Sequence, residues 1–294
     1  MPGGTTTTEV LRQSLPALIN EARIIQEYGT VMIGLADRVR LGEGVGNVWT
    51  EIDLAKLTAS AITETTEEDN PQQLADNPFN LTPAVISVHT VITDRTARNI
   101  SKNVFAKTGS LGQNAIDRKK DIDGLVVLDG FTTSLGGAGT TLTTGQIAAG
   151  ATRVRSNTTE PWDGSVAFVL HGFQMKDLFD ELVAGVGTYP IPVGDTSTVF
   201  KGGFHLPIMN AAGFMDDNII IDSNADAKGG TFASGPGGAL VLCQARAPWV
   251  KIIRNEKLGG GASEVLHRDE YAWGERSPGN WGYENFTDAT APTS

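Results

Sequence analysis

The most distinctive pattern of apolar and polar positions lies between residues 41 and 92. Two sets of residues alternate in its first half, one of Val48, Thr50, Ile52 and Leu54, the other of Trp49, Glu51 and Asp53. Such alternation indicates a β-strand with one covered face. From Glu51 to Asp76, seven acidic residues accompany a single base, Lys56, and a hairpin with so little apolar material is marginally stable alone. The pattern therefore predicts a β-hairpin arm that has to lie on another surface.

Prolines indicate where this arm turns. The predicted turning region contains Asn70-Pro71, Asp76-Asn77-Pro78 and Thr82-Pro83. A returning strand is expected from Ala84 to Thr93, with Ile86, Val88 and Ile92 on one face.

The longest helical pattern follows at once, from Thr93 to about Leu128, and Thr93-Asp94 is a favourable N-cap pair. Its predicted apolar stripe consists of Ile100, Val104, Leu111, Ala115, Ile116, Ile122, Leu125, Val126 and Leu128. The charged residues 117–121 are expected to face solvent. Gly109, Gly112 and Gly124 each weaken a helix by up to ~1 kcal/mol relative to alanine, and we interpret them as positions where another backbone approaches closely.

The rest of the chain predicts a mixed α+β fold in more than one unit. An amphipathic helix is expected from Thr8 to Gly29, interrupted at Pro16; it packs either on a partner subunit or on the chain's own core. The glycine-rich stretch 135–140 predicts a linker and a domain boundary. The elements expected after it are a capped helix at 143–156, a strand at 166–170, a helix from 175 to 185, short strands at 188–238, and closing strands at 240–243, 248–254 and 270–286. The aromatic-rich end is predicted to return and cover the long helix.

Composition narrows the classes of function. The 294 residues include 35 glycines, and 23 basic against 34 acidic residues give a net charge of −11. This charge argues against an ordinary nucleic-acid-binding protein and against attachment to anionic lipid, because both depend on a basic face. No apolar run approaches the ~18 residues of a spanning helix, and no signal peptide is expected, so a cytoplasm-like compartment is predicted. The single cysteine, Cys243, lies in an apolar run and is expected to be a small buried residue.

The sequence predicts no catalytic, cofactor-binding or metal-ligating residues. The four histidines, His89, His171, His205 and His267, have no paired spacing and are expected to be structural or on the surface. Residues 42–46 resemble a nucleotide-binding loop only superficially and are better explained as a hinge. Residues 222–226 resemble the start of a calcium loop but have Ala227 and Ala233 at two essential positions, so a plain Asx-rich turn is expected. The fit is poorer still at 121–124, and the acids at Glu64, Glu67, Glu68 and Asp69 are expected to be a solvated tip.

The order of these elements resembles that of the major capsid proteins of tailed bacteriophages, which have the Hong Kong 97-type fold. The resemblance covers essentially the whole chain. Local stretches similar to the family are Thr132-Thr133-Ser134-Leu135-Gly136, Ser156-Asn157-Thr158-Thr159-Glu160-Pro161, residues 221–229 and Asp288-Ala289-Thr290-Ala291-Pro292.

The resemblance implies a division of the chain into four parts. These are an N-terminal arm at 1–29, an E-loop at 30–92, a peripheral (P) domain at 93–142 and 240–294, and an axial (A) domain at 143–239. It implies a non-enzymatic shell protein that forms hexamers and pentamers, with the E-loop over a neighbouring subunit. The shell would enclose double-stranded DNA without sequence-specific binding, in a virion assembled in the host bacterial cytoplasm. Separate scaffolding, portal and decoration proteins are the further partners implied, no membrane is involved, and no crosslink is predicted from Lys56.

Two other functions stay open from the sequence. An encapsulin-like compartment would keep the fold but enclose a cargo enzyme instead of a genome. An acidic, β-rich hydrolase with an unrecognised site is the alternative from another class.

Overall fold

The computed structural model describes residues 5–6, 27–65, 71–99, 102–186, 208–258 and 260–293. Residues 8–26 of the expected N-terminal helix and His205 lie outside the described residues. The described chain is organised in two five-stranded sheets and one two-stranded sheet.

The first sheet is long and has the order β1-β5-β11-β10-β2. Its strands are β1 (Thr5–Thr6), β5 (Ala84–Thr93), β11 (Ala262–Glu275), β10 (Leu240–Asn255) and β2 (Asp37–Arg40). β11 pairs antiparallel with both β5 and β10. The strand expected at 84–93 is confirmed, and so is its inner face, since Ile92 is buried and Ile86 packs against the main core.

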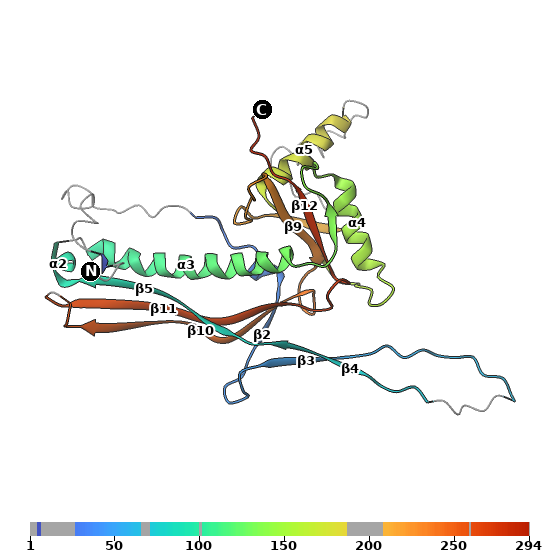
Figure 1. The fold of residues 1–294 in the computed structure, drawn as a ribbon, viewed down its shortest axis with the longest axis horizontal. Helices are drawn as coiled ribbons and strands as arrows, with labels where there is room; N and C mark the ends of the chain where they lie inside the picture. Colours follow the sequence, from blue (N-terminus) through green and yellow to red (C-terminus); the bar gives the residue numbers. More distant parts are fainter. Residues whose placement is uncertain are drawn as a thin grey trace.

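The predicted long helix is present as α2 (Asp94–Asn99) followed by α3 (Lys102–Asp129). Figure 1 shows α3 running along the first sheet, and the short helix α1 (Met32–Leu35) contacts it. Thr93 Oγ1 accepts a hydrogen bond from the backbone N of Thr96 at 3.3 Å, so the predicted N-cap is confirmed.

Only part of the predicted stripe of α3 is buried. Ile116, Leu125 and Leu128 are in the interior, whereas Leu111 and Val126 are exposed. The aromatic-rich end does return to cover this helix, because Tyr271 and Trp273 on β11 belong to or pack against the same core as Leu125 and Leu128.

Two glycines of α3 let the sheet approach closely. A Cβ at Gly112 would lie 2.5 Å from the ring of His267, and one at Gly124 would lie 3.0 Å from the ring of Trp273. The expected close approach is therefore present, but side chains make it, not another backbone. Gly109 has no neighbouring atom within 4 Å.

The prediction that residues 117–121 all face solvent is wrong for Lys120 and Asp121, which are 4% and 0% exposed. Lys120 Nζ forms an ion pair with Asp269 Oδ2 at 2.5 Å. Asp121 accepts hydrogen bonds from two backbone N–H groups at the start of α1. The helical pattern alone does not distinguish these two residues from solvated charges, because the partners of both lie far away in the sequence.

The second sheet has the order β6-β12-β9-β7-β8. Its strands are β6 (Ser134–Gly136), β12 (Gly282–Asp288), β9 (Asp226–Ala233), β7 (Val166–Leu170) and β8 (Ala211–Met215). The helices α4 (Thr144–Arg155) and α5 (Gly172–Val186) pack against it. The helix expected from Thr143 is confirmed with a full capping box between Thr143 and Gln146.

Two features of this sheet differ from the sequence-based expectation. Residues 135 and 136 of the expected linker belong to β6, which pairs with β12. Gly136 is needed there because its φ is +100° and a Cβ would lie 2.5 Å from the carbonyl oxygen of Phe286. β12 in turn pairs with β9, so the closing segment 240–294 contributes strands to both five-stranded sheets.

The arm is the separate two-stranded sheet of β3 (Trp49–Leu54) and β4 (Asp76–Leu81). The strand predicted at 48–54 is confirmed, but its partner is β4, since β5 pairs with β11 instead. Pro78, expected in a turn, lies within β4, where it is tolerated because each strand of a two-stranded sheet has a free edge. Figure 1 shows the arm projecting well beyond both larger sheets.

Candidate assembly surfaces

One arginine fastens the base of the arm to the body. Arg276, directly after β11, donates from Nε to Glu51 Oε2 at 2.8 Å and from Nη2 to Asp37 Oδ2 at 3.0 Å. Its Nη1 donates to the carbonyl oxygen of Gly238 at 2.8 Å. The Arg276 side chain is only 13% exposed, and its partners Asp37 and Glu51 are 18% and 37% exposed. These partly shielded, charge-assisted hydrogen bonds hold β2 and β3 to the end of β11.

Apolar contacts support the same attachment of the arm to the body. Trp49 and Phe79 pack edge to face, with ring centroids 6.1 Å apart. Leu81 belongs to a small buried cluster with Leu41, Val241 and Cys243. It can approach β11 because Gly274 lies opposite, where a Cβ would be 2.4 Å from Leu81 Cδ2. The base of the arm is therefore a fixed part of the body.

Beyond its base, the described part of the arm has no core. Of the residues in β3 and β4, only Leu81 is buried. Exposed apolar side chains are Ile52 at 61%, Leu54 at 64%, Leu57 at 57%, Ile62 at 58% and Leu74 at 64%. Isolated exposed apolar residues are normal, but several on one projecting element are typical of an interaction surface.

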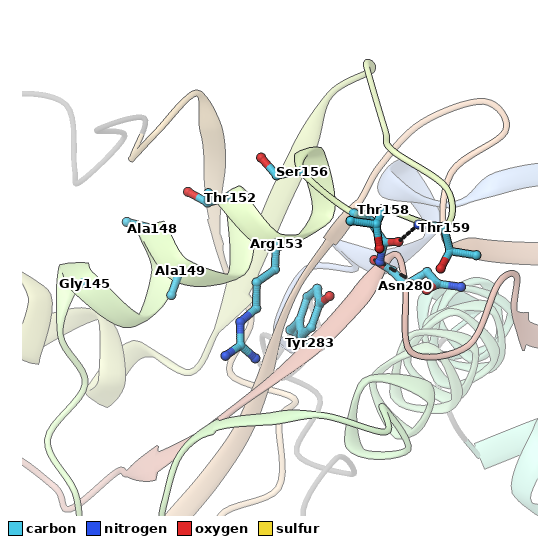
Figure 2. A pocket seen from close by; sticks show the side chains of 11 residues that line it. Gly145, Ala148, Ala149, Thr152, Arg153, Ser156, Thr158, Thr159, Asn280 and Tyr283 are labelled. Carbon is cyan, nitrogen blue, oxygen red and sulfur yellow. Dashed lines mark hydrogen bonds between the residues drawn. The ribbon is translucent and has the colours of Figure 1, made fainter. Parts of the chain in front are cut away.

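A second candidate surface is a groove of about 780 Å³ along α4. Small side chains of α4 line it together with Asn280 and Tyr283, and Figure 2 shows Arg153 reaching from α4 towards Tyr283. Among the described residues that line it, Arg153 alone is charged, and its guanidinium carbon lies 5.8 Å from the centroid of the Tyr283 ring. Without an acid–base pair or a nucleophile beside a base, this lining suits packing against another surface better than catalysis.

The three described histidines have separate surroundings. His171 Nδ1 accepts a hydrogen bond from the backbone N of Phe173 at 3.1 Å, and burial lowers the pKa of His171, with the nearby Asp217 opposing this effect. His267 is 4% exposed and lies against Gly112. His89, on β5, lies 3.4 Å from Glu264 on β11.

The loop at 222–226 is the Asx-rich turn that the sequence predicts. Asp222 Oδ1 accepts hydrogen bonds from the backbone N of Asn224 at 2.8 Å and of Asp226 at 2.9 Å. Asp226 Oδ1 accepts one from the backbone N of Gly139 at 2.7 Å. These oxygens are thus engaged by the backbone. No cluster of three or more His, Cys, Asp or Glu side chains suited to a metal ion occurs in the part of the chain that the structure describes.

The other sequence candidates are placed as follows. Residues 42–46 precede β3 and no helix, so they do not form a nucleotide-binding loop. Cys243 is fully buried, as expected, and burial raises its pKa. Lys56 and Glu64 are exposed on the arm, while 66–70 lie outside the described residues.

No helix within the described ranges is long and apolar enough to cross a membrane. The buried Lys120 and Asp121 and the arginine at the base of the arm were missed from the sequence, where nothing marks their distant partners.

Comparison with solved structures identifies the fold of this chain. No family model and no curated relative matches the chain. Among solved structures, a protein of Mycobacterium phage Che8 matches with a TM-score of 0.68 and 14% identity, covering 92% of this chain and 97% of that one. The head structure of Helicobacter pylori bacteriophage KHP40 matches with a TM-score of 0.70 and 11% identity, covering 92% and 94%. An encapsulin of Synechococcus elongatus matches with a TM-score of 0.62 and 10% identity over 99% of both chains. Since many of the matching structures are tailed-phage capsid proteins, this chain has the Hong Kong 97-type capsid fold.

Proposed function

We propose that this chain is the major capsid protein of a tailed bacteriophage and that its copies assemble into an icosahedral shell of hexamers and pentamers. The observation that carries this proposal is the arm. It is joined firmly at its base by Arg276 and Leu81, yet it exposes five large apolar side chains further out. An element of this kind is completed by a second surface, and the fold shared with phage capsid structures supports a neighbouring copy in that role.

Repeated contacts explain how a weakly covered arm contributes to a stable shell. Apolar area buried against a neighbour contributes roughly 25 cal/mol per Å² before the costs of association. Each arm-to-body contact is heterologous, and such contacts form rings when the rotation closes. Many modest contacts in one closed particle then act together through their high effective concentration.

The sheets suggest which segments form each part of the subunit. The P domain would contain α2 and α3 with β5, β10 and β11, and the A domain α4 and α5 with the second sheet, including β12. The E-loop would be the arm within 30–92, and residues 1–29 the N-terminal arm.

The role proposed here is structural and not catalytic, with the protein located in the virion. Double-stranded DNA would be enclosed without sequence-specific contacts, and the net charge of −11 suits a shell that does not grip its genome. Separate scaffolding, portal and decoration proteins are the other proposed partners.

The test is assembly of arm variants, observed by electron microscopy. Deletion of residues 50–80 is expected to leave a folded subunit, measured by circular dichroism, that no longer forms closed shells. Replacing Ile52 and Leu54 together by serine is the finer version, and Ile220→Ser is its matched control, because Ile220 is 73% exposed on the turn after β8. Normal shells from the deletion or from the double variant would refute the assignment of the arm.

The encapsulin match supports one other function, a compartment around a cargo enzyme. Native particles that contain DNA and a portal favour the capsid. A uniform shell around one enzyme, without a portal, favours the compartment.

A further inference from the structure

Two buried carboxyl groups meet where three segments of the subunit come together. Asp121 lies on α3, on the side that faces the start of α1, and Asp216 lies in the turn after β8. Asp121 is 0% exposed and Asp216 is 2% exposed. This place, called the joint below, therefore connects the long helix, the chain leading to the arm, and the second sheet.

The hydrogen bonds of the joint converge on these two groups. Asp121 Oδ1 accepts from the backbone N of Val31 at 2.9 Å and of Met32 at 3.0 Å. Asp121 Oδ2 accepts from Asn218 Nδ2 at 3.0 Å, and Asp216 Oδ1 accepts from the backbone N of Asn218 at 3.0 Å. One asparagine thus bridges both carboxyl groups, and Asp121 accepts from three N–H donors.

Asp216 is satisfied differently. Its Oδ2 is buried, and no donor reaches it from the described chain. The side chain of Asp216 lies next to that of Asp121, because Asn218 donates to both carboxyl groups. Two ionised carboxylates in this position would repel each other in a place shielded from water, which is strongly unfavourable. A proton on Asp216 Oδ2 removes the repulsion and makes Oδ2 a hydrogen-bond donor to Asp121.

No cation compensates the pair among the described residues. On α3, Lys120 pairs with Asp269 and Arg118 with Glu27. Asp217, next to Asp216, accepts from the backbone N of Gly172 and lies 3.8 Å from His171. On β9, Lys228 is engaged by Asp129 and Glu284.

We propose that Asp216 and Asp121 share one proton and that this proton holds the joint closed, so that the joint weakens as the proton is released to solvent. Burial first, and then the hydrogen bond with Asp121, raise the pKa of Asp216 to about 7. Because the pKa is raised in the closed state, opening releases this proton, and closure is favoured most in acid. The equilibrium constant for opening of the joint is expected to rise about tenfold per pH unit, starting near the ordinary pKa of an aspartate and continuing up to about pH 7. Above about pH 7 it should level off. The inference concerns the single subunit and holds independently of the proposed function.

Hydrogen exchange of the full-length chain, read by mass spectrometry, tests the proposal. The reporter is the peptide 27–36, whose Val31 and Met32 amides bond to Asp121. After correction for intrinsic exchange, its protection should fall about tenfold between pH 5.5 and 6.5 and become constant above about pH 7.5. The variant Asp216→Asn should lose this dependence. Protection that does not vary with pH in the unsubstituted chain, or an equal slope in Asp216→Asn, would overturn the proposal.

Glu275→Gln is the matched control, because Glu275 is another buried carboxyl group whose pKa burial raises to about 7, at the end of β11. It should keep the full pH response of peptide 27–36, and loss of that response would overturn the assignment to Asp216. If Asp216→Asn does not fold, infrared spectroscopy of Glu275→Gln decides. A band of a protonated carboxyl group should persist at pH 6 and disappear near pH 7 to 8, and its absence at pH 6 would contradict the shared proton.

Discussion

Replacement of Lys120 by methionine should destabilise the subunit severely. The Lys120 side chain is 6% exposed and its partner Asp269 is 0% exposed, so the substitution leaves a carboxylate in the interior without its cation. Breaking a buried pair in this way costs ~3–5 kcal/mol. Gln244 Nε2 and the backbone N of Glu270 still donate to Asp269 Oδ1. The contact of Lys120 with the Tyr271 ring, 4.9 Å from Nζ to centroid, is also lost. A loss of about 3–4 kcal/mol in the free energy of unfolding is therefore expected.

The neighbouring residue offers a matched control. Lys119 pairs with Asp123 one turn along the same helix, but its side chain is 55% exposed. Lys119→Met should therefore cost only ~0.5 kcal/mol or less. Both variants have the same helix propensity and the same change of charge, so their difference isolates burial.

Urea unfolding of the unassembled subunit, followed by circular dichroism, measures both losses. A loss below about 1 kcal/mol, or equal losses for the two lysines, would refute the reasoning that the pair is shielded from water.

Three further predictions concern other parts of the subunit. Gly112→Ala should lower the free energy of unfolding by ~1–3 kcal/mol, because its methyl group would lie 2.5 Å from the ring of His267. Gly109→Ala, with no atom within 4 Å, should raise it by up to ~1 kcal/mol. The reverse order of urea midpoints would contradict the packing of α3. Burial raises the pKa of Glu275 from 4.5 to about 7, so this residue lowers the stability of the fold progressively as pH rises through that window. Glu275→Gln should therefore flatten the curve of stability against pH between these values. An unchanged curve would exclude this role of Glu275. Thr143→Ala removes the cap of α4 and should cost ~1 kcal/mol, with faster amide exchange in the first turn of α4, and an unaltered rate there would show that the cap contributes little.

Local patterns predicted local structure well. The capping box at Thr143, the five apolar residues of β7 and the alternation in β3 each determine a conformation within a few residues, and each is present. The resemblance in element order predicted the fold because that order is a property of the whole chain.

What the sequence could not show are the pairings over long separations. Lys120 and Asp269 are buried because they neutralise each other, and nothing near either residue indicates the other. The sequence predicts that the arm returns at 84–93, because Asp76-Asn77-Pro78 indicates a turn, whereas proline is tolerated at the free edge of β4. The attachment of the arm at its base depends on Arg276, which lies 225 residues from Glu51.

The strand orders also determine when the subunit can form during synthesis. β11 lies between β5 and β10 in the first sheet, and β12 lies between β6 and β9 in the second. Both are made after every other described strand, so neither sheet can close until residues 262–288 have left the ribosome. Folding therefore waits for contacts of high sequence separation, which form slowly. Chains that terminate before residue 262 would lack an interior strand in both sheets, so prematurely ended products are excluded from any assembly that requires the folded subunit.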